Sequence, residues 1–316
     1  FDGTIVTGGG PVGEPDPRND FNGDGVSDIL LRAGFGPVFV IDVAGASAQT
    51  SFLPPFLPAS WEIIGTGDFN GDGLDDLLWQ TPRGAVLVGE MGSDGKASLS
   101  FGGMMPDGWS IAGTGDFDND GYDDALFRHA TTGEVVIASL SGGSLATETV
   151  SASTPLSARI VATGDFDGDG TDDVLWQDLT GAGSVDVWQM DGASATTATL
   201  GAAVAGAGIA GAGDFTADGV DDILWREADG DLFIWELDQD GTVNTQPVSA
   251  LGLEWEVVGT GDYTGDGTDD ILARDTATGD FGLIAMDNGV PSWEIIATAP
   301  PGWSVEGQQA DEFLFV

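Results

Sequence analysis

The chain repeats one acidic turn six times at nearly constant spacing. Each copy has the form Asp-aromatic-x-x-Asp-Gly-x-x-Asp, and the copies begin at Asp20, Asp68, Asp116, Asp165, Asp214 and Asp262. Neighbouring copies start 48 or 49 residues apart. A period this regular predicts one structural unit for each copy of the turn rather than a scattered motif.

Each turn has oxygen ligands at a spacing that suits a hard cation. Side-chain oxygens occupy positions one, three, five and nine, and position seven offers its backbone carbonyl. Position six is always Gly, which permits the positive φ of a tight loop. No His or Cys takes part, which argues against zinc, copper or iron, and five or more protein oxygens favour calcium over magnesium.

About six Ca²⁺ ions are therefore expected. The predicted ligands, at positions one, three, five, seven and nine of successive copies, are Asp20, Asn22, Asp24, Val26, Asp28, Asp68, Asn70, Asp72, Leu74, Asp76, Asp116, Asp118, Asp120, Tyr122, Asp124, Asp165, Asp167, Asp169, Thr171, Asp173, Asp214, Thr216, Asp218, Val220, Asp222, Asp262, Thr264, Asp266, Thr268 and Asp270. Plain hairpin turns are the alternative, but each would then gather three or four mutually repelling carboxylates. The third and fourth copies have Asp at position three and are expected to bind most tightly.

The sequence predicts β-strands on both sides of each turn. In the second copy Trp61–Gly67 leads into the turn, Asp76–Gln80 leaves it, and Ala85–Gly89 and Ala97–Phe101 follow. An EF-hand is excluded because it needs a Glu at position twelve, where this copy has Trp79, and helices on both sides. Four short strands in about 48 residues is the size of one blade of a β-propeller.

We expect a single all-β domain over residues 1–316, a propeller of four-stranded blades. Seven blades is the preferred count, with six plus a terminal extension as the alternative. The seventh, metal-free blade would combine residues 303–316 with residues 1–10, because Thr4–Thr7 and Asp311–Val316 both read as strands. The N- and C-terminal strands would then close the ring and remove its exposed edges.

The stretch from Thr66 to Trp79, with echoes at Thr114, Thr163 and Thr260, resembles the FG-GAP and VCBS repeats of integrin α-subunit heads and of many secreted bacterial and fungal proteins. The resemblance extends from about Asp20 to Gly307. It implies a calcium-bearing β-propeller whose loops lie between the first and second strands of each blade. Family members serve in cell adhesion, in sugar binding and beside enzymes, so the resemblance does not fix the ligand.

Composition indicates where such a chain works. The net charge is −45, which argues against nucleic acid and anionic membranes as partners. Calcium sites of modest affinity operate outside the cytosol, so an extracellular or cell-surface location is expected. No signal peptide is present and Phe1 replaces an initiator Met, which predicts a processed or excised chain. Cysteine is absent, so neither disulfides nor thiol chemistry is available.

The expected role is a non-catalytic binding or adhesion module. His129 is the only histidine and reads as a solvated turn residue. Alternatives are a carbohydrate-binding lectin, with a glycan or surface protein as partner, and a self-associating subunit of an extracellular filament or surface assembly. A polysaccharide-active enzyme module is the least favoured. Tryptophans recur in phase, as in Trp79, Trp176 and Trp225, which predicts packing between blades rather than a ligand site.

A basic or amide side chain recurs twelve residues after the first Asp of each copy. These residues are Arg32, Gln80, Arg128, Gln177, Arg226 and Arg274. One interpretation is that each side chain bridges to the neighbouring blade. The other is a positive belt that binds an anionic or polyhydroxylated ligand.

Overall fold

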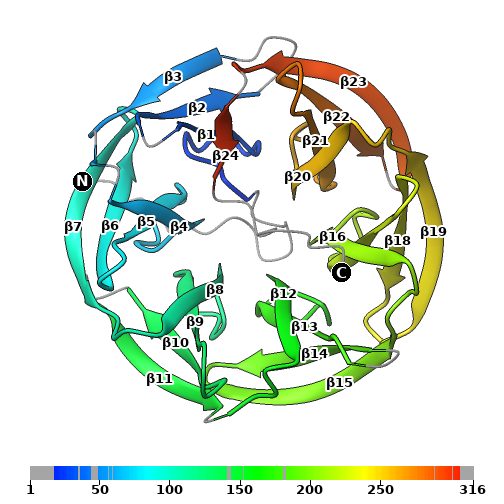
Figure 1. Cartoon of the computed structure of the whole chain (residues 1–316), viewed down its shortest axis with the longest axis horizontal. Helices are drawn as coiled ribbons and strands as arrows, with labels where there is room; N and C mark the ends of the chain where they lie inside the picture. The colour runs from blue at the N-terminus through cyan, green and yellow to red at the C-terminus, as the bar shows by residue number, and fades with distance from the viewer. Residues whose placement is uncertain are drawn as a thin grey trace, which may run out of the picture.

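The computed structural model describes residues 18–306 except residues 35, 44–48, 56, 59, 141–143, 152, 181–182, 288 and 301. The described elements are all strands, arranged in six four-stranded sheets. The sheets are arranged as blades around a central axis (Figure 1). The all-β propeller predicted from the period of the acidic turn is therefore confirmed.

Each blade is an antiparallel meander that runs from an inner strand near the axis to an outer strand at the rim (Figure 1). Blades 1 to 3, each from inner to outer strand, are β24 Trp303–Val305, β1 Ile29–Ala33, β2 Val38–Asp42 and β3 Gln49–Leu53; β4 Glu62–Gly67, β5 Asp76–Gln80, β6 Ala85–Gly92 and β7 Lys96–Met104; and β8 Trp109–Gly115, β9 Asp124–His129, β10 Val135–Ser139 and β11 Ala146–Ser151.

Blades 4 to 6, in the same order, are β12 Ala158–Gly164, β13 Asp173–Asp178, β14 Ser184–Asp191 and β15 Ser194–Ala202; β16 Ala207–Gly213, β17 Asp222–Glu227, β18 Asp231–Leu237 and β19 Val243–Ala250; and β20 Trp255–Gly261, β21 Asp270–Asp275, β22 Asp280–Asp287 and β23 Val290–Thr298. The acidic turns, hereafter loops 1 to 6, lead into the second strand of each blade, and in blades 2 to 6 they follow its inner strand directly.

The prediction of seven blades is wrong, and the described residues form six. β24 pairs with β1, with Ala33 opposite Trp303 and Leu31 opposite Val305, so the Trp303 strand is the inner strand of blade 1. One C-terminal strand and three N-terminal strands thus make up a single blade instead of adding another. Closure by the C-terminal strand is confirmed. The strands predicted in residues 1–10 and 311–316 lie outside the described residues.

Hydrogen bonds between loops also close the ring at six. In every loop the amide of position eight donates to the carbonyl of position one in the preceding blade. The bonds are Asp75 to Asp20 at 2.9 Å, Asp123 to Asp68 at 2.9 Å, Asp172 to Asp116 at 2.9 Å, Asp221 to Asp165 at 2.7 Å, Asp269 to Asp214 at 2.9 Å and Ser27 to Asp262 at 2.8 Å.

A hydrophobic core fills each of the six seams between neighbouring blades. The aromatic residue of each turn is buried; Phe21, Phe69, Phe117, Phe166, Phe215 and Tyr263 are all at most 4% exposed. Trp79, Trp176 and Trp225 are also buried, which confirms the packing interpretation of these tryptophans. The aromatic position thus anchors each acidic loop to the apolar interior.

The recurring arginines join neighbouring blades. Arg32 donates to the Trp61 carbonyl at 2.7 Å, Arg128 to the Ala158 carbonyl at 2.6 Å, and Arg226 to the Gly252 carbonyl at 3.2 Å. Arg274 donates to the Trp303 carbonyl and so links blade 6 to the C-terminal strand. The bridging interpretation is therefore correct for these four arginines.

The uncharged stretch from Gly192 to Gly213 contains all of β15 and β16. Among the described residues, no helix is long and apolar enough to cross a membrane.

Candidate metal centres in the acidic loops

The first Asp of each turn organises the loop that follows it. In loop 1 the Oδ1 atom of Asp20 accepts the Gly23 amide at 2.7 Å, and its Oδ2 atom accepts the Gly25 amide at 2.8 Å. The Oδ2 contact to the position-six amide recurs in all six loops at 2.8 or 2.9 Å. A carboxylate is needed here because it accepts several amides at once.

Two positions in each loop adopt left-handed backbone. Position six was predicted to do so, and Gly219, for example, has φ of 82°. Position four does so as well, which sequence reasoning missed. It is Gly in four loops, but Asn119 has φ of 56° and Ala217 has φ of 58°. Alanine has no polar side chain to support this conformation, so loop 5 is strained at Ala217.

The Asp at position nine of each turn, called the ninth Asp, ends the loop and is buried. The third strand of the blade donates an amide to Oδ1 of this residue in four loops, as from Met190 to Asp173 at 2.9 Å and from Leu237 to Asp222 at 2.9 Å. The second oxygen, Oδ2, of Asp222 and of Asp270 is buried without a hydrogen-bond partner. Such an atom is costly unless something else satisfies it.

Unpartnered buried oxygens also occur at position three. They are Oδ1 of Asp167 and Oγ1 of Thr216. Every carboxylate oxygen among the buried, unpartnered side-chain atoms of the described residues belongs to an acidic loop. These oxygens therefore occur at two of the positions that the spacing assigns to a cation.

Burial raises the pKa of the ninth Asp in every loop, and the other loop carboxylates add to the shift. The pKa is about 9 for Asp222, about 7 for Asp124, and about 8 for Asp28, Asp76, Asp173 and Asp270. A bound cation would reverse this effect by favouring the ionised carboxylates.

Loops 3 and 4 gather the most carboxylates. The Asp116, Asp118 and Asp120 carboxylates each bring one oxygen within 4.8 Å of the other two, and Asp165, Asp167 and Asp173 do the same. No other acidic loop brings three carboxylates together in this way within the part of the chain described. Loops 3 and 4 are also the two for which the sequence predicts the tightest binding.

In loops 1 and 2 the position-three side chain is an amide, and it presents its nitrogen rather than its oxygen to the ninth Asp. Asn22 donates to Oδ2 of Asp28 at 3.3 Å, and Asn70 donates to Oδ2 of Asp76 at 3.1 Å. Each amide would have to rotate to present its oxygen to a cation. In both loops the position-five carboxylate accepts the amide of position seven, as Asp24 does from Val26 at 3.1 Å. Carboxylate, hydroxyl and amide oxygens are a donor set that fits a hard cation such as calcium.

Sequence reasoning missed the role of position eight. In four loops its carboxylate accepts the amide of position one in the preceding blade, as Asp75 does from Asp20 at 2.9 Å and Asp269 from Asp214 at 3.0 Å. The Asp-Asp pair at the end of these turns is visible in the sequence. The first Asp of the pair, at position eight, bonds to the preceding blade, whereas the second Asp, at position nine, is one of the predicted cation ligands.

Arg18 was also missed. Arg18 occupies the repeat position at which the other blades have Thr66, Thr114, Thr163, Ala212 and Thr260. Threonine hydroxyls at this position donate to the preceding blade, as Thr163 does to the Thr114 carbonyl at 2.7 Å. Ala212 has no hydroxyl to donate to the Thr163 carbonyl. Arg18 reaches across from blade 1 to donate to this carbonyl at 3.3 Å and to the Ala212 carbonyl at 3.1 Å.

The Arg18 guanidinium also neutralises inner carboxylates. Its Nη2 atom lies 2.5 Å from Oδ2 of Asp221. Burial raises the pKa of Asp221 to about 6 and of Asp172 and Asp269 to about 7, although the positive charge of Arg18 opposes each shift. Arg18 is therefore a fixed internal cation shared by three blades.

The described residues form a six-bladed β-propeller with one acidic loop at the same place in each blade. This arrangement defines the class of protein. Two family models match the chain. The FG-GAP-like repeat matches residues 116–176, from loop 3 into β13, and the FG-GAP repeat matches residues 60–99, in blade 2. Both matched segments are thus FG-GAP-type repeats, as the turn motif predicts.

Solved structures share the fold at low identity. An oligogalacturonate lyase in complex with manganese is 11% identical, with a TM-score of 0.50, over 89% of this chain and 76% of the lyase chain. The oligogalacturonate lyase from Vibrio parahaemolyticus is 10% identical, with a TM-score of 0.49, over 87% and 80%. The Dos1 propeller is 8% identical, with a TM-score of 0.44, over 84% and 68%. A search of curated proteins gives no match. At these identities the likeness concerns the fold alone.

Proposed function

We propose that the chain is a calcium-binding β-propeller that acts outside the cell, or at its surface, as a non-catalytic binding or adhesion module. The observation that carries the calcium assignment is the set of buried oxygens without partners at positions three and nine, on Asp167, Thr216, Asp222 and Asp270. Calcium would satisfy these oxygens and remove the repulsion among the loop carboxylates.

The loops serve a structural purpose in this proposal. In blades 2 to 6 each joins the inner strand of its blade to the second strand, and all six loops are hydrogen-bonded to one another around the ring. Calcium would therefore stabilise the whole propeller and leave the opposite face and the rim free to bind partners. The extracellular assignment rests on the calcium concentration that loops of this type require.

A chelator experiment with a matched pair of variants tests the calcium assignment. EDTA should lower the melting temperature of the native chain by many degrees, and added calcium should restore it. Asp222→Asn removes one buried loop charge and should reduce the response to calcium. Asp240→Asn removes an exposed charge from the same blade, outside the loop, and should leave the response unchanged. Identical calcium responses in both variants and the native chain would count against the proposal.

A further inference from the structure

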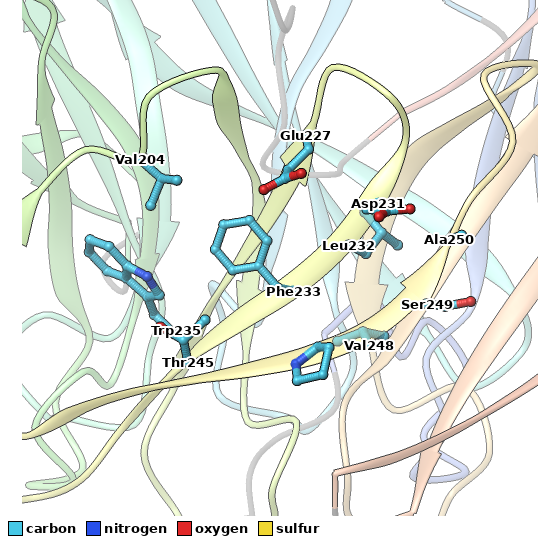
Figure 2. Close-up of a pocket in the computed structure, with 11 residues that line it drawn as sticks. Val204, Glu227, Asp231, Leu232, Phe233, Trp235, Thr245, Val248, Ser249 and Ala250 are labelled. Carbon is cyan, nitrogen blue, oxygen red and sulfur yellow. The ribbon is translucent and has the colours of Figure 1, made fainter.

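A cavity of about 600 Å³ lies on blade 5, at its seam with blade 4. Figure 2 shows Phe233 and Trp235 of β18, with Val204 of the segment between β15 and β16 nearby. Glu227, the last residue of β17, and Asp231, the first residue of β18, lie at the same cavity. An apolar wall and two carboxylates thus share one space, away from the acidic loops.

The aromatic wall of the cavity, formed by Phe233 and Trp235, is held in place by packing against the core. Trp225 is fully buried, and its ring lies parallel to that of Phe233 with centroids 6.1 Å apart. The Trp235 ring packs on Trp225 as well, with centroids 4.9 Å apart. Pro247, which also lines the cavity, is opposite Phe233 on β19. The wall is therefore formed before any ligand arrives, which lowers the entropic cost of binding.

The carboxylates at the cavity are not neutralised. Glu227, Asp229 and Asp231 each bring a carboxylate oxygen within 4.8 Å of the other two. Asp229 and Asp231 are exposed, and Glu227 is half-buried. The two salt bridges among the described residues, Arg18 to Asp221 and Lys96 to Asp94, lie elsewhere. The charge at this edge of the cavity therefore favours a cationic ligand over a neutral sugar.

In the equivalent hairpins of blades 4 and 6, hydroxyl groups donate hydrogen bonds to the acidic residues. In blade 4, Thr180 donates to Oδ2 of Asp178 at 2.8 Å, and in blade 6, Thr298 donates to Oδ1 of Asp280 at 2.6 Å. Among the described residues, no comparable hydroxyl donor reaches the Glu227 or Asp231 carboxylate. Unlike these hairpins of blades 4 and 6, the hairpin of blade 5 thus combines carboxylates that accept no hydroxyl with an aromatic wall.

We propose that this cavity binds a lysine side chain of a partner protein, presented among apolar residues. The four-carbon stem would lie along Phe233 and Trp235, and the ammonium group would meet Glu227 and Asp231, because lysine buries its stem and keeps its charge at the polar end. An ammonium near an aromatic face gains additional electrostatic attraction. This inference specifies the partner chemistry of the binding role proposed above and rests on it.

The test compares two peptides that differ only in charge. One is acetyl-Leu-Val-Lys-Val-Leu-amide, and the other carries Nε-acetyl-lysine at the central position, which keeps the stem and removes the charge. Binding is measured by titration calorimetry in saturating calcium, so that a failure of peptide binding is separate from a failure of the calcium loops. We expect the lysine peptide to bind about tenfold more tightly.

Matched variants separate the cavity from the general acidity of the chain. Glu227→Gln combined with Asp231→Asn should abolish the preference for the charged peptide. Asp107→Asn combined with Glu148→Gln makes the same charge change at exposed residues of blade 3 and should preserve it. Phe233→Leu should weaken both peptides, and the charged peptide more, because it also removes an aromatic face near the ammonium group. Unchanged melting curves would show that the variants are folded. Equal affinities for the two peptides, or a preference that survives the Glu227/Asp231 change, would overturn the proposal, as would binding of neutral oligosaccharides alone.

Discussion

The backbone amide of Ser27 donates to the carbonyl of Asp262 at 2.8 Å and so joins the first acidic loop to the last. Five equivalent bonds join the other neighbouring loops. The loops therefore form a closed circuit, and the position-one residue of each is held by the next blade. A conformational change in one loop, such as the binding of a cation, is expected to affect its neighbours through these bonds.

The seam between blades 6 and 1 should depend strongly on Arg274. This guanidinium lies over Phe281 with its carbon 5.2 Å from the ring centre, donates to the Trp303 carbonyl and is almost fully buried. Arg274→Gln should cost about 2 kcal/mol of unfolding free energy because the carbonyl of the half-buried Trp303 loses a charged donor. Arg226→Gln, which removes one contact at 3.2 Å, should cost about 1 kcal/mol or less. Urea titration measures both, and equal losses would contradict the special role of the closing seam.

Arg18 should be among the most important polar residues in the ring. Arg18→Gln would leave the inner carboxylates of Asp172, Asp221 and Asp269 without their shared cation. The expected loss is about 2 to 3 kcal/mol, less than for a fully buried ion pair, because the Arg18 side chain is 26% exposed. Lys96→Gln breaks the other described salt bridge, in which the side chains are 60% and 65% exposed, and should change stability very little. A small effect for Arg18→Gln in urea would show that the guanidinium is dispensable.

Much of the fold could be predicted because the turn repeats. The period gives the blade size, and the residues on either side of Asp68–Asp76 give the strands that enter and leave the loop. The blade count could not be settled because the inner strand of blade 1 is contributed by the other end of the chain. Trp303 has the signature of an inner strand, but its partner strand, β1, is about 270 residues away.

The place of each acidic loop in its blade was predictable, whereas the contacts between loops were not; the cation ligands stay a prediction. Oxygen spacing identifies positions one, three, five and nine. Nothing in the spacing shows that Asp75 bonds the amide of Asp20, or that Arg18 replaces the hydroxyl that Ala212 lacks. Such contacts join residues of different blades, and they depend on how the ring closes.

Loop 5 should gain stability from Ala217→Gly. Ala217 has φ of 58°, a conformation that costs an alanine about 1 to 2 kcal/mol, and glycine adopts it without that cost. Part of the gain is lost to the greater freedom of glycine in the unfolded chain, so the net increase should be about 0.5 to 1 kcal/mol. Asn119→Gly changes the same position of loop 3 and should gain less, because asparagine tolerates this conformation. A loss of stability in Ala217→Gly would contradict the strain.

The chelated protein should become less stable as pH rises. Burial raises the pKa of Asp222 to about 9, far above the value of about 3.9 in an unfolded chain. The folded state then binds more protons, so the stability that this carboxyl contributes is fully present below about pH 4 and is lost as pH rises through about pH 9. The melting temperature in EDTA should fall between about pH 5 and about pH 8, and saturating calcium should suppress the fall.

The Asp222→Asn variant isolates this group from the general acidity of the chain. It should make the pH dependence in EDTA less steep, because one titrating carboxyl is gone while the ninth Asp of the other five loops still titrates. Asp229→Asn removes an exposed carboxyl of the same blade and should leave the slope unchanged. Equal slopes in the two variants would indicate that overall charge, and not the buried loop carboxyls, controls the pH response.

The most direct test of the calcium assignment counts the ions bound to the native chain. The protein is equilibrated with calcium, passed through a desalting column and analysed for metal by mass spectrometry. One ion for each acidic loop predicts about six calcium ions per chain. A protein that retains no calcium, and whose melting curve is the same in calcium and in EDTA, would contradict the account.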